Sequence, residues 1–272
     1  MPVMLSYPKS GRTWLRFMVD SYLCKAYNLP CANVFDAEKQ LKQTRPIQWT
    51  HLTGAMIAKM PYWAMGPWNL DKAARQVPWL VLTRNFQATL ASAYFQARDR
   101  IKVFEGTPSE FLRDPRYGVI KLVTFYNLFE ELRPTLSDCH VFSYETMLDA
   151  PRPHFVKVVQ TLGLGVDEAR IDTVIAEASF DNMKRLSVTP EYAGSVLAPT
   201  DPTKPETFKV RSAGRDKKQL FNEDDISYID RVTDDLFVHR DHDDYRRCLG
   251  RPVSRNAKAE AKNEKLEGSH AA

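Results

Sequence analysis

Cysteine is scarce in this sequence, with four residues in a chain of 272. None belongs to a C-x-x-C pair, and no cluster of histidine and cysteine lies beside any of them, so a zinc site is not expected. So few cysteines in so long a chain do not indicate a disulfide framework. We therefore expect reduced thiols and a cytoplasmic setting. The four are Cys24, Cys31, Cys139 and Cys248.

Long apolar runs and concentrated charge are also missing. No stretch reaches the roughly 18 apolar residues of a membrane-spanning helix, and no basic and apolar leader precedes the first predicted strand, so neither a membrane span nor a signal peptide is expected. The formal net charge is +4, and no dense block of Lys and Arg occurs. This balance permits a small anionic ligand but does not predict a nucleic-acid partner.

The chain does contain short apolar runs alternating with segments of helical period, which favours an α/β fold with a central parallel sheet flanked by helices. We expect one domain over residues 1–253. The predicted strands are Val3–Tyr7, Ile47–Leu52, Trp79–Thr83 and Cys139–Tyr144, and the first and the last of them are expected to be buried. The predicted helices are Thr13–Tyr27, Gln87–Arg100, Tyr117–Leu132, Pro151–Leu162, Asp167–Ala178, Ser179–Leu186 and Asp224–Phe237.

Two segments do not fit this alternation. Residues 189–209 contain four prolines and a glycine and predict a long irregular loop, which is uncommon unless it is functional or disordered. Residues 254–272 are polar, rich in Ala, Lys and Glu, and carry no hydrophobic face. That composition predicts a disordered tail.

The segment Tyr7–Trp14, with the sequence YPKSGRTW, lies between the first predicted strand and the first predicted helix. A helix N-terminus offers free backbone N–H groups and the positive end of its dipole. Gly11 lets the backbone close around an anion, Lys9 adds a positive charge, and Ser10 and Thr13 add hydroxyl donors. The segment therefore predicts a phosphate-binding loop. On these residues alone, a plain turn with a surface lysine remains an alternative.

This loop is not a Walker A loop. That motif places lysine directly after the second glycine of G-x-x-x-x-G-K-[ST], whereas here Lys9 precedes Gly11 and no earlier glycine exists. A nucleotide would be held differently from the way a P-loop kinase holds it.

The loop resembles the phosphosulfate loop of the sulfotransferases that use PAPS (3′-phosphoadenosine-5′-phosphosulfate), which reads Y-P-K-S-G-[ST]-[ST]-W. Seven of the eight positions match, and Arg12 is the departure because a hydroxyl residue is usual there. The resemblance implies a P-loop-like nucleotide-binding fold. It implies that Lys9, Ser10, Gly11, Arg12, Thr13 and Trp14 bind the donor, and that no metal is required.

Three further segments are similar to the same family. Arg84 and Ser92 have the spacing of its 3′-phosphate motif, in which an Arg follows a strand and a Ser lies eight residues later on the next helix. The guanidinium fork suits a phosphate. Tyr144 ends a strand that reads like the family's, and Phe180 lies in an S-F-x-x-M-K segment. By this resemblance Trp14 and Phe180 would sandwich the adenine, although Phe180 and Tyr144 could equally be packing residues.

The match is weakest at residues 208–216. The family often has F-x-R-K-G-x-x-G-[DE]-W there, whereas this chain keeps the Phe and basic residues but lacks the first Gly and the Trp. Arg211 and Arg215 are candidates for the grip on the 3′-phosphate. The dimer motif K-x-x-x-T-V-x-x-x-E is not satisfied after Lys217 or Lys218, so the oligomeric state stays open.

Sulfuryl transfer needs a base for the acceptor proton and a cation for the leaving bridge oxygen. Lys9 suits the second role. Among six histidines, His51 ends a predicted strand in a T-H-L context like that of the family's catalytic histidine. A neutral imidazole can accept the proton. We expect a small-molecule acceptor to lie between His51, residues 60–68 and the proline-rich loop. Four aromatic side chains are candidates for its wall, although they could equally be packing residues: Tyr62, Trp63, Trp68 and Tyr192.

Two rival functions remain open at this point. One is a P-loop kinase, against which the order of Lys9 and Gly11 argues. The other is a non-catalytic nucleotide-binding protein of the same fold, which would have no need of the pair Lys9 and His51.

Overall fold

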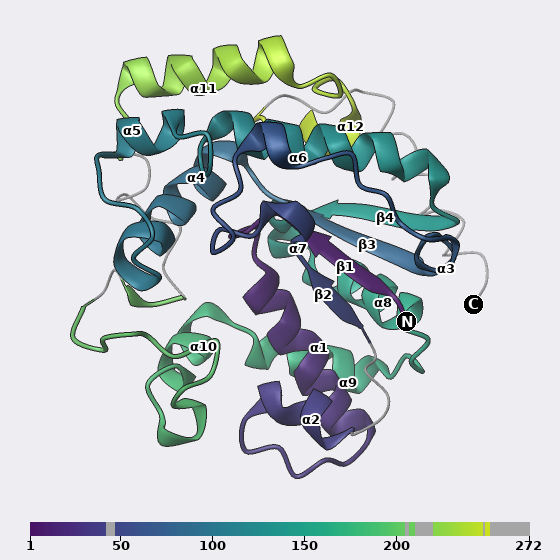
Figure 1. Ribbon diagram of the computed structural model, residues 1–272. Helices are drawn as coiled ribbons and strands as arrows, with labels where there is room; N and C mark the ends of the chain where they lie inside the picture. The colour runs from purple at the N-terminus through teal and green to yellow at the C-terminus, as the bar shows by residue number, and fades with distance from the viewer. Residues whose placement is uncertain (42–46, 205–206, 210–219, 247, 251–272) are drawn as a thin grey trace.

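The computed structural model describes residues 1–41, 47–204, 207–209, 220–246 and 248–250. A parallel sheet lies between two groups of helices (Figure 1). Its strands are β1 (Val3–Ser6), β2 (Gln48–Thr50), β3 (Pro78–Thr83) and β4 (Asp138–Ser143), in the order β2-β1-β3-β4. All three pairings are parallel. The predicted α/β fold with a central parallel sheet is therefore confirmed.

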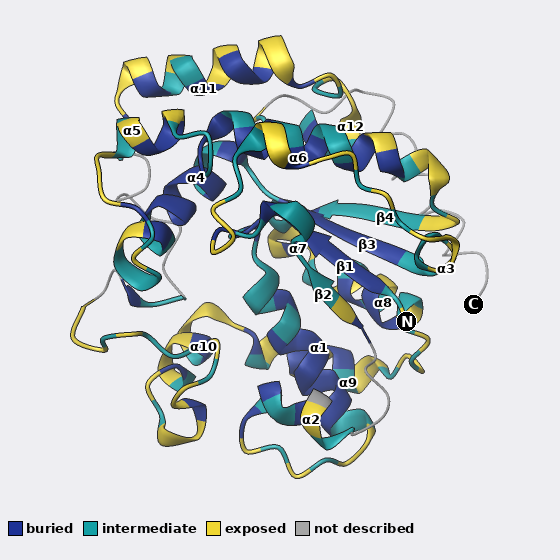
Figure 2. Ribbon diagram, viewed as in Figure 1, coloured by how far each residue is buried: buried dark blue, intermediate teal, exposed yellow. Residues whose placement is uncertain are grey.

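Alternate side chains of the central strands pack on opposite faces of the sheet, as the period of two requires. Val3 and Leu5 of β1 and Val81 of β3 belong to one buried cluster. Met4 of β1 and Leu80 of β3 belong to the other. Figure 2 shows these strands buried between the two helical layers. Because both faces are covered, the two central strands are apolar runs without polar alternation.

Helices cover both faces of the sheet. The first cluster includes residues of α4 (Phe86–Phe95), α6 (Val119–Leu132) and α11 (Glu223–Leu236), and the second includes residues of α1 (Arg12–Ala26), α8 (Pro151–Thr161) and α9 (Glu168–Glu177). The remaining α-helices are short: α2 (Ala37–Gln40), α3 (Lys72–Arg75), α5 (Pro108–Arg113), α7 (Tyr144–Asp149), α10 (Phe180–Leu186) and α12 (Asp243–Arg246). The longer helices agree with the predicted ones to within a few residues.

Two elements depart from the prediction near the site. The helix expected over Gln87–Arg100 is α-helical only to Phe95 and continues as a π-helix over Gln96–Arg100. The strand expected to end at Tyr144 ends at Ser143, whose side-chain oxygen accepts from the N–H of Thr146 at 3.0 Å and starts α7. Tyr144 is therefore the first residue of a helix, at the carboxyl end of the sheet.

The prediction that β4 is buried is wrong for most of its length. β4 is an edge strand of the described sheet, and only Ser143 among its six residues is buried. His140 is partly exposed and its Nε2 lies 3.4 Å from a carboxylate oxygen of Asp138. The apolar run Cys139–Phe142 does not distinguish an edge strand from a central one.

The expectation that the cysteines are reduced is also wrong for one pair. Cys24 and Cys31 form a disulfide across the end of α1, whereas Cys139 and Cys248 are free thiols. The spacing of seven residues carried no signal for this bond, because only the turn after α1 brings the two side chains together. The cytoplasmic setting stays a prediction.

The proline-rich loop at residues 189–209 contains one short 3₁₀ turn, Pro190–Tyr192, and is otherwise irregular where it is described. Arg100, at the end of the π-helix, donates to the carbonyl of Thr207 at 2.6 Å and to that of Ala198 at 3.1 Å. These two hydrogen bonds hold the loop against the end of α4.

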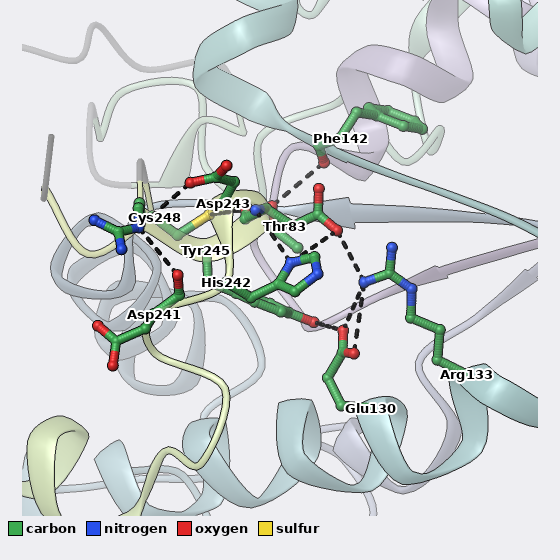
Figure 3. A network of polar contacts seen from close by, with 11 residues as sticks. Thr83, Glu130, Arg133, Phe142, Asp241, His242, Asp243, Tyr245 and Cys248 are labelled. Carbon is green, nitrogen blue, oxygen red and sulfur yellow. Dashed lines mark hydrogen bonds and ion pairs between the residues drawn. The ribbon is translucent and has the colours of Figure 1, made fainter. Parts of the chain in front are cut away.

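The last described residues pack back onto the ends of β3 and β4 (Figure 3). The Cys248 thiol donates to Thr83 Oγ1 at 3.1 Å, and Thr83 in turn donates to the Phe142 carbonyl at 3.3 Å. The Cys248 carbonyl accepts from the Asn85 side chain at 3.0 Å and from the Phe86 N–H at 3.1 Å. Residues on both sides of Arg84 are thereby fixed.

No helix among the described residues is long and apolar enough to cross a membrane. The predicted tail at residues 254–272 lies outside the described residues, so the domain boundary at residue 253 stays a prediction.

Candidate active site

A cavity of about 530 Å³ lies at the carboxyl ends of the strands, where parallel α/β sheets bind their ligands. Ten of the residues predicted for donor binding or catalysis line it: Lys9, Gly11, Arg12, Thr13, Trp14, His51, Arg84, Ser92, Tyr144 and Phe180. The fold therefore brings together segments that are up to about 170 residues apart in the sequence.

The loop before α1 has an unusual backbone. Lys9 has φ 74° and Gly11 has φ 100°, both in the left-handed region. A Cβ on Gly11 would lie 2.3 Å from Cδ2 of Tyr144, so no larger residue fits at this position without moving that ring. Gly11, Arg12 and Thr13, at the start of α1, line the cavity, where an anion would meet the positive end of the helix dipole.

Ser10 is the exception within the loop. Its side chain is fully buried, its N–H donates to the Tyr7 carbonyl at 3.3 Å, and it is not part of the cavity lining. Its predicted contact with the donor stays a prediction.

Lys9 and Arg84 are joined through the loop backbone. Arg84 Nη1 donates to the Lys9 carbonyl at 2.8 Å, and Lys9 Nζ donates to Gln96 Oε1 at 3.2 Å. Gln96 is the first residue of the π-helix and lines the cavity. Sequence reasoning missed it, and the insertion of a π-turn into a helix, frequent at functional sites, leaves no clear pattern in the residues.

Arg84 leaves the carboxyl end of β3 with its guanidinium 4.7 Å from the centre of the Tyr144 ring. Burial lowers the pKa of Arg84, and Tyr144 and Glu145 oppose that effect. Glu145 also accepts from the Asn85 N–H at 3.0 Å. Ser92 is largely buried on α4 and reaches the same cavity. Arg84 and Ser92 thus place a guanidinium and a hydroxyl in the same cavity as the loop, and their predicted contact with the 3′-phosphate stays a prediction.

Aromatic side chains line the part of the cavity that lies next to α9 and α10. The rings of Trp14 and Tyr144 meet edge to face with centres 5.6 Å apart, and the Trp14 indole donates to the Ala178 carbonyl at 2.9 Å. Phe180 lines the same cavity and keeps 40% of its surface exposed. Ile175 and Met183 complete this part. Such a wall suits a planar apolar ligand such as a nucleobase.

His51 follows β2 directly, and its Nδ1 lies 2.6 Å from the Ser6 carbonyl oxygen. A carbonyl only accepts, so we assign the imidazole proton to Nδ1, which leaves Nε2 as the acceptor. Burial lowers the pKa of His51 to about 3, with smaller contributions from Arg12, Lys209 and Lys9. The ring is therefore neutral near pH 7 and able to take a proton.

Lys209 lines the cavity as well, although it was not predicted. Burial, together with Arg100 and Arg12, lowers its pKa to about 8. Burial and Arg16 lower the pKa of Arg12 to about 10. The candidates Arg211 and Arg215 lie outside the described residues. Lys209 lies beside them in the segment where the family pattern is most altered, which is why that pattern did not single it out.

The four aromatic candidates for the acceptor wall pack elsewhere in the structure. None of the four aromatic residues lines the cavity. Tyr192 is buried against Phe35 at 6.2 Å between ring centres, and Trp68 packs on Phe125 at 5.1 Å. Tyr62 and Trp63 pack on each other at 5.0 Å. The residues that follow His51 and line the cavity are aliphatic: Ala55, Met56 and Ile57.

Comparison with known proteins decides the family. A family model described as the sulfotransferase domain matches residues 2–240. The chain belongs to this family. Its reaction is sulfuryl transfer, and the predicted enzyme class is confirmed. Among the described residues of this sulfotransferase, no three His, Cys, Asp or Glu side chains are grouped so that they could hold a metal ion.

A curated relative is Sulfotransferase 1C2 of Rattus norvegicus, 23% identical over 203 residues, or 69% of this chain and 67% of the relative. A solved structure of mouse sulfotransferase SULT7A1 complexed with PAP matches with a TM-score of 0.60 at 19% identity, over 92% of this chain and 87% of that chain. Retinol dehydratase in complex with androsterone and PAP matches with a TM-score of 0.56 at 13% identity, over 87% and 80%. At these identities the structural matches establish the fold.

Proposed function

We propose that this sulfotransferase moves the sulfuryl group of PAPS to a hydroxyl or amine of a small acceptor. One observation carries the proposal: two anion positions, an aromatic wall and a neutral histidine line a single cavity. The loop with Lys9 suits the 5′-phosphosulfate and Arg84 with Ser92 suits the 3′-phosphate. The wall of Trp14, Tyr144 and Phe180 suits the adenine.

The reaction needs two protein groups in this cavity. Nε2 of His51 would accept the proton of the acceptor hydroxyl or amine while the oxygen or nitrogen of the acceptor forms the bond to sulfur. The bond from sulfur to the bridge oxygen breaks, and the negative charge that grows on this oxygen would be stabilised by Lys9. The hydrogen bond from Lys9 to Gln96 holds the ammonium near the loop before a ligand arrives.

The low pKa of His51 fits this order of events. In the free enzyme, burial and the nearby cations keep the ring unprotonated. Bound phosphosulfate would offset those positive charges and raise the pKa of His51, because an opposite charge stabilises the imidazolium. The base would therefore become stronger only when the donor is in place.

Thermal shift with nucleotides tests the donor assignment. We expect PAP, the 3′,5′-bisphosphate product, to raise the melting temperature clearly more than 5′-AMP, because AMP leaves the position at Arg84 and Ser92 empty. A ligand present at 100 times its Kd stabilises by about 2.7 kcal/mol, which is readily measured. ADP and ATP should stabilise less than PAP.

The matched comparison is R84M, which removes the guanidinium but keeps an unbranched side chain. It should reduce the difference between PAP and AMP, because only PAP carries the phosphate that Arg84 is proposed to bind. Stabilisation by ATP but not by PAP would instead favour a kinase and contradict the proposal.

A further inference from the structure

The cavity carries an excess of positive charge. Four cationic side chains line it, namely Lys9, Arg12, Arg84 and Lys209, and no Asp or Glu of the described residues does. Burial lowers the pKa of Arg12, Arg84 and Lys209, because removal from water destabilises the charged form. An excess of buried positive charge predicts that the ligands of this cavity carry negative charge.

Two of the four cations are assigned to the donor. Lys9 lies in the phosphosulfate loop, and Arg84 lies in the 3′-phosphate position. The resemblance also expects Arg12 to bind the donor, but Arg12 replaces the hydroxyl residue that is usual in that loop, and Lys209 was not predicted at all. Arg12 and Lys209 are the two cations with the largest effect on the pKa of His51, larger than that of Lys9, and Arg12 also lowers the pKa of Lys209. Both therefore lie at the end of the cavity that contains the proposed base.

Neither Arg12 nor Lys209 forms an ion pair with a carboxylate among the described residues. By contrast, Arg16, one turn after Arg12 on α1, pairs with Asp20 at 3.2 Å. Lys204, on the same loop as Lys209, lies 3.6 Å from Asp201. Among the described residues, Arg12 and Lys209 thus line the cavity without a carboxylate partner, whereas their neighbours Arg16 and Lys204 each have one.

Lys209 is also held in place from outside the cavity. Arg100 binds the carbonyl of Thr207, two residues before Lys209, and that of Ala198. Because Arg100 and Gln96 are the two ends of the same π-helix, the segment that carries Lys209 is tied to the element that contacts Lys9. The remaining wall near His51 is aliphatic, with Ala55, Met56, Ile57 and Ile101 lining the cavity.

We propose that the acceptor is itself an anion: a small hydroxylated or amino carboxylic acid whose carboxylate binds Arg12 and Lys209 and whose apolar body lies on the aliphatic wall. This inference rests on the proposed function. In this arrangement Arg12, which stands where the family usually has a hydroxyl residue, selects the acceptor. A guanidinium suits a carboxylate because two N–H groups can meet its two oxygens.

Pairs of acids and their methyl esters test the inference. We would measure transfer of labelled sulfur from PAPS to 4-hydroxyphenylacetic acid, 3-(4-hydroxyphenyl)propanoic acid and 6-hydroxyhexanoic acid, each beside its ester. We expect kcat/KM for the acid to exceed that for the ester roughly tenfold or more in at least one pair, as for a hydrogen bond to a charged group. K209M and R12M should each bring this ratio toward one.

K204M is the control, because Lys204 lies on the same loop, is paired with Asp201 and does not line the cavity. It should keep the wild-type ratio. A second readout avoids turnover: the acids, but not the esters, should further raise the melting temperature of the enzyme saturated with PAP.

The inference is overturned if esters react as well as their acids in every pair, or if K209M and R12M both keep the ratio. It is also overturned if no acid binds the PAP complex. In those cases the proposed function stands as long as a neutral phenol such as 4-ethylphenol is sulfated. If PAP does not bind and nothing is sulfated, the proposed function itself fails.

Discussion

H51Q is expected to lower kcat about 10²- to 10⁴-fold, the usual contribution of a positioned general base. Glutamine can still donate to the Ser6 carbonyl that now holds Nδ1 of His51, but it cannot take up the acceptor proton. The position of the loop should therefore be kept while the chemical step is lost. Initial rates at saturating donor, together with PAP binding, would separate the two effects.

The control for this variant is H140Q. His140 lies on β4, partly exposed, and is not part of the cavity lining, so its replacement should leave kcat within about twofold of the wild type, as for most surface substitutions. The pH profile gives a further check. Because the His51 pKa is about 3 in the free enzyme, kcat/KM for the donor should not fall, as pH is lowered, near the ordinary histidine pKa of about 6.5. Full activity of H51Q would remove His51 from the mechanism.

K9M is expected to lower kcat about 10²- to 10³-fold, as when one group that stabilises a developing charge is removed. Methionine keeps an unbranched apolar stem but has no charge for the bridge oxygen. PAP binding should weaken by a smaller factor, because the α1 amides, Arg84 and Ser92 remain. Rates of the chemical step in a single turnover would show the larger loss.

A matched variant controls for the backbone. Lys9 has φ 74°, so any replacement could disturb a turn that favours few residues. Lys59 also has positive φ, 50°, is exposed and does not line the cavity. K59M should therefore behave like the wild type. If K9M also kept the wild-type kcat, the charge of Lys9 would have no part in leaving-group stabilisation.

The sheet and most of the candidate donor site could be predicted from the sequence. Short apolar runs bounded by turn residues identify strands, and parallel strands bring their carboxyl ends to one edge, so Trp14, Arg84 and Tyr144 had to meet there. These residues lie within two or three positions of a strand end or a helix start. Their places follow from local structure plus the topology of the sheet.

The acceptor side could not be predicted in the same way. Trp68 and Tyr192 looked like binding aromatics, but large rings are also the best core formers, and the path of irregular segments decides which role each takes. Lys209 comes from the end of a long loop whose position depends on hydrogen bonds from Arg100. No local pattern encodes that contact. The same holds for Cys248, which fixes the residues beside Arg84 from the far end of the chain.

Transfer of the label from sulfur-labelled PAPS to a small acceptor is the most direct measurement of the central claim. Incubation of the purified chain with labelled PAPS and a panel of hydroxylated and amino compounds should give a labelled acceptor and PAP in equal amounts, without added metal and dependent on the enzyme. Two results would contradict this claim. One is hydrolysis of PAPS, in which inorganic sulfate is the only labelled product beside PAP; the other is that PAPS is not consumed with any acceptor although the folded protein binds PAP.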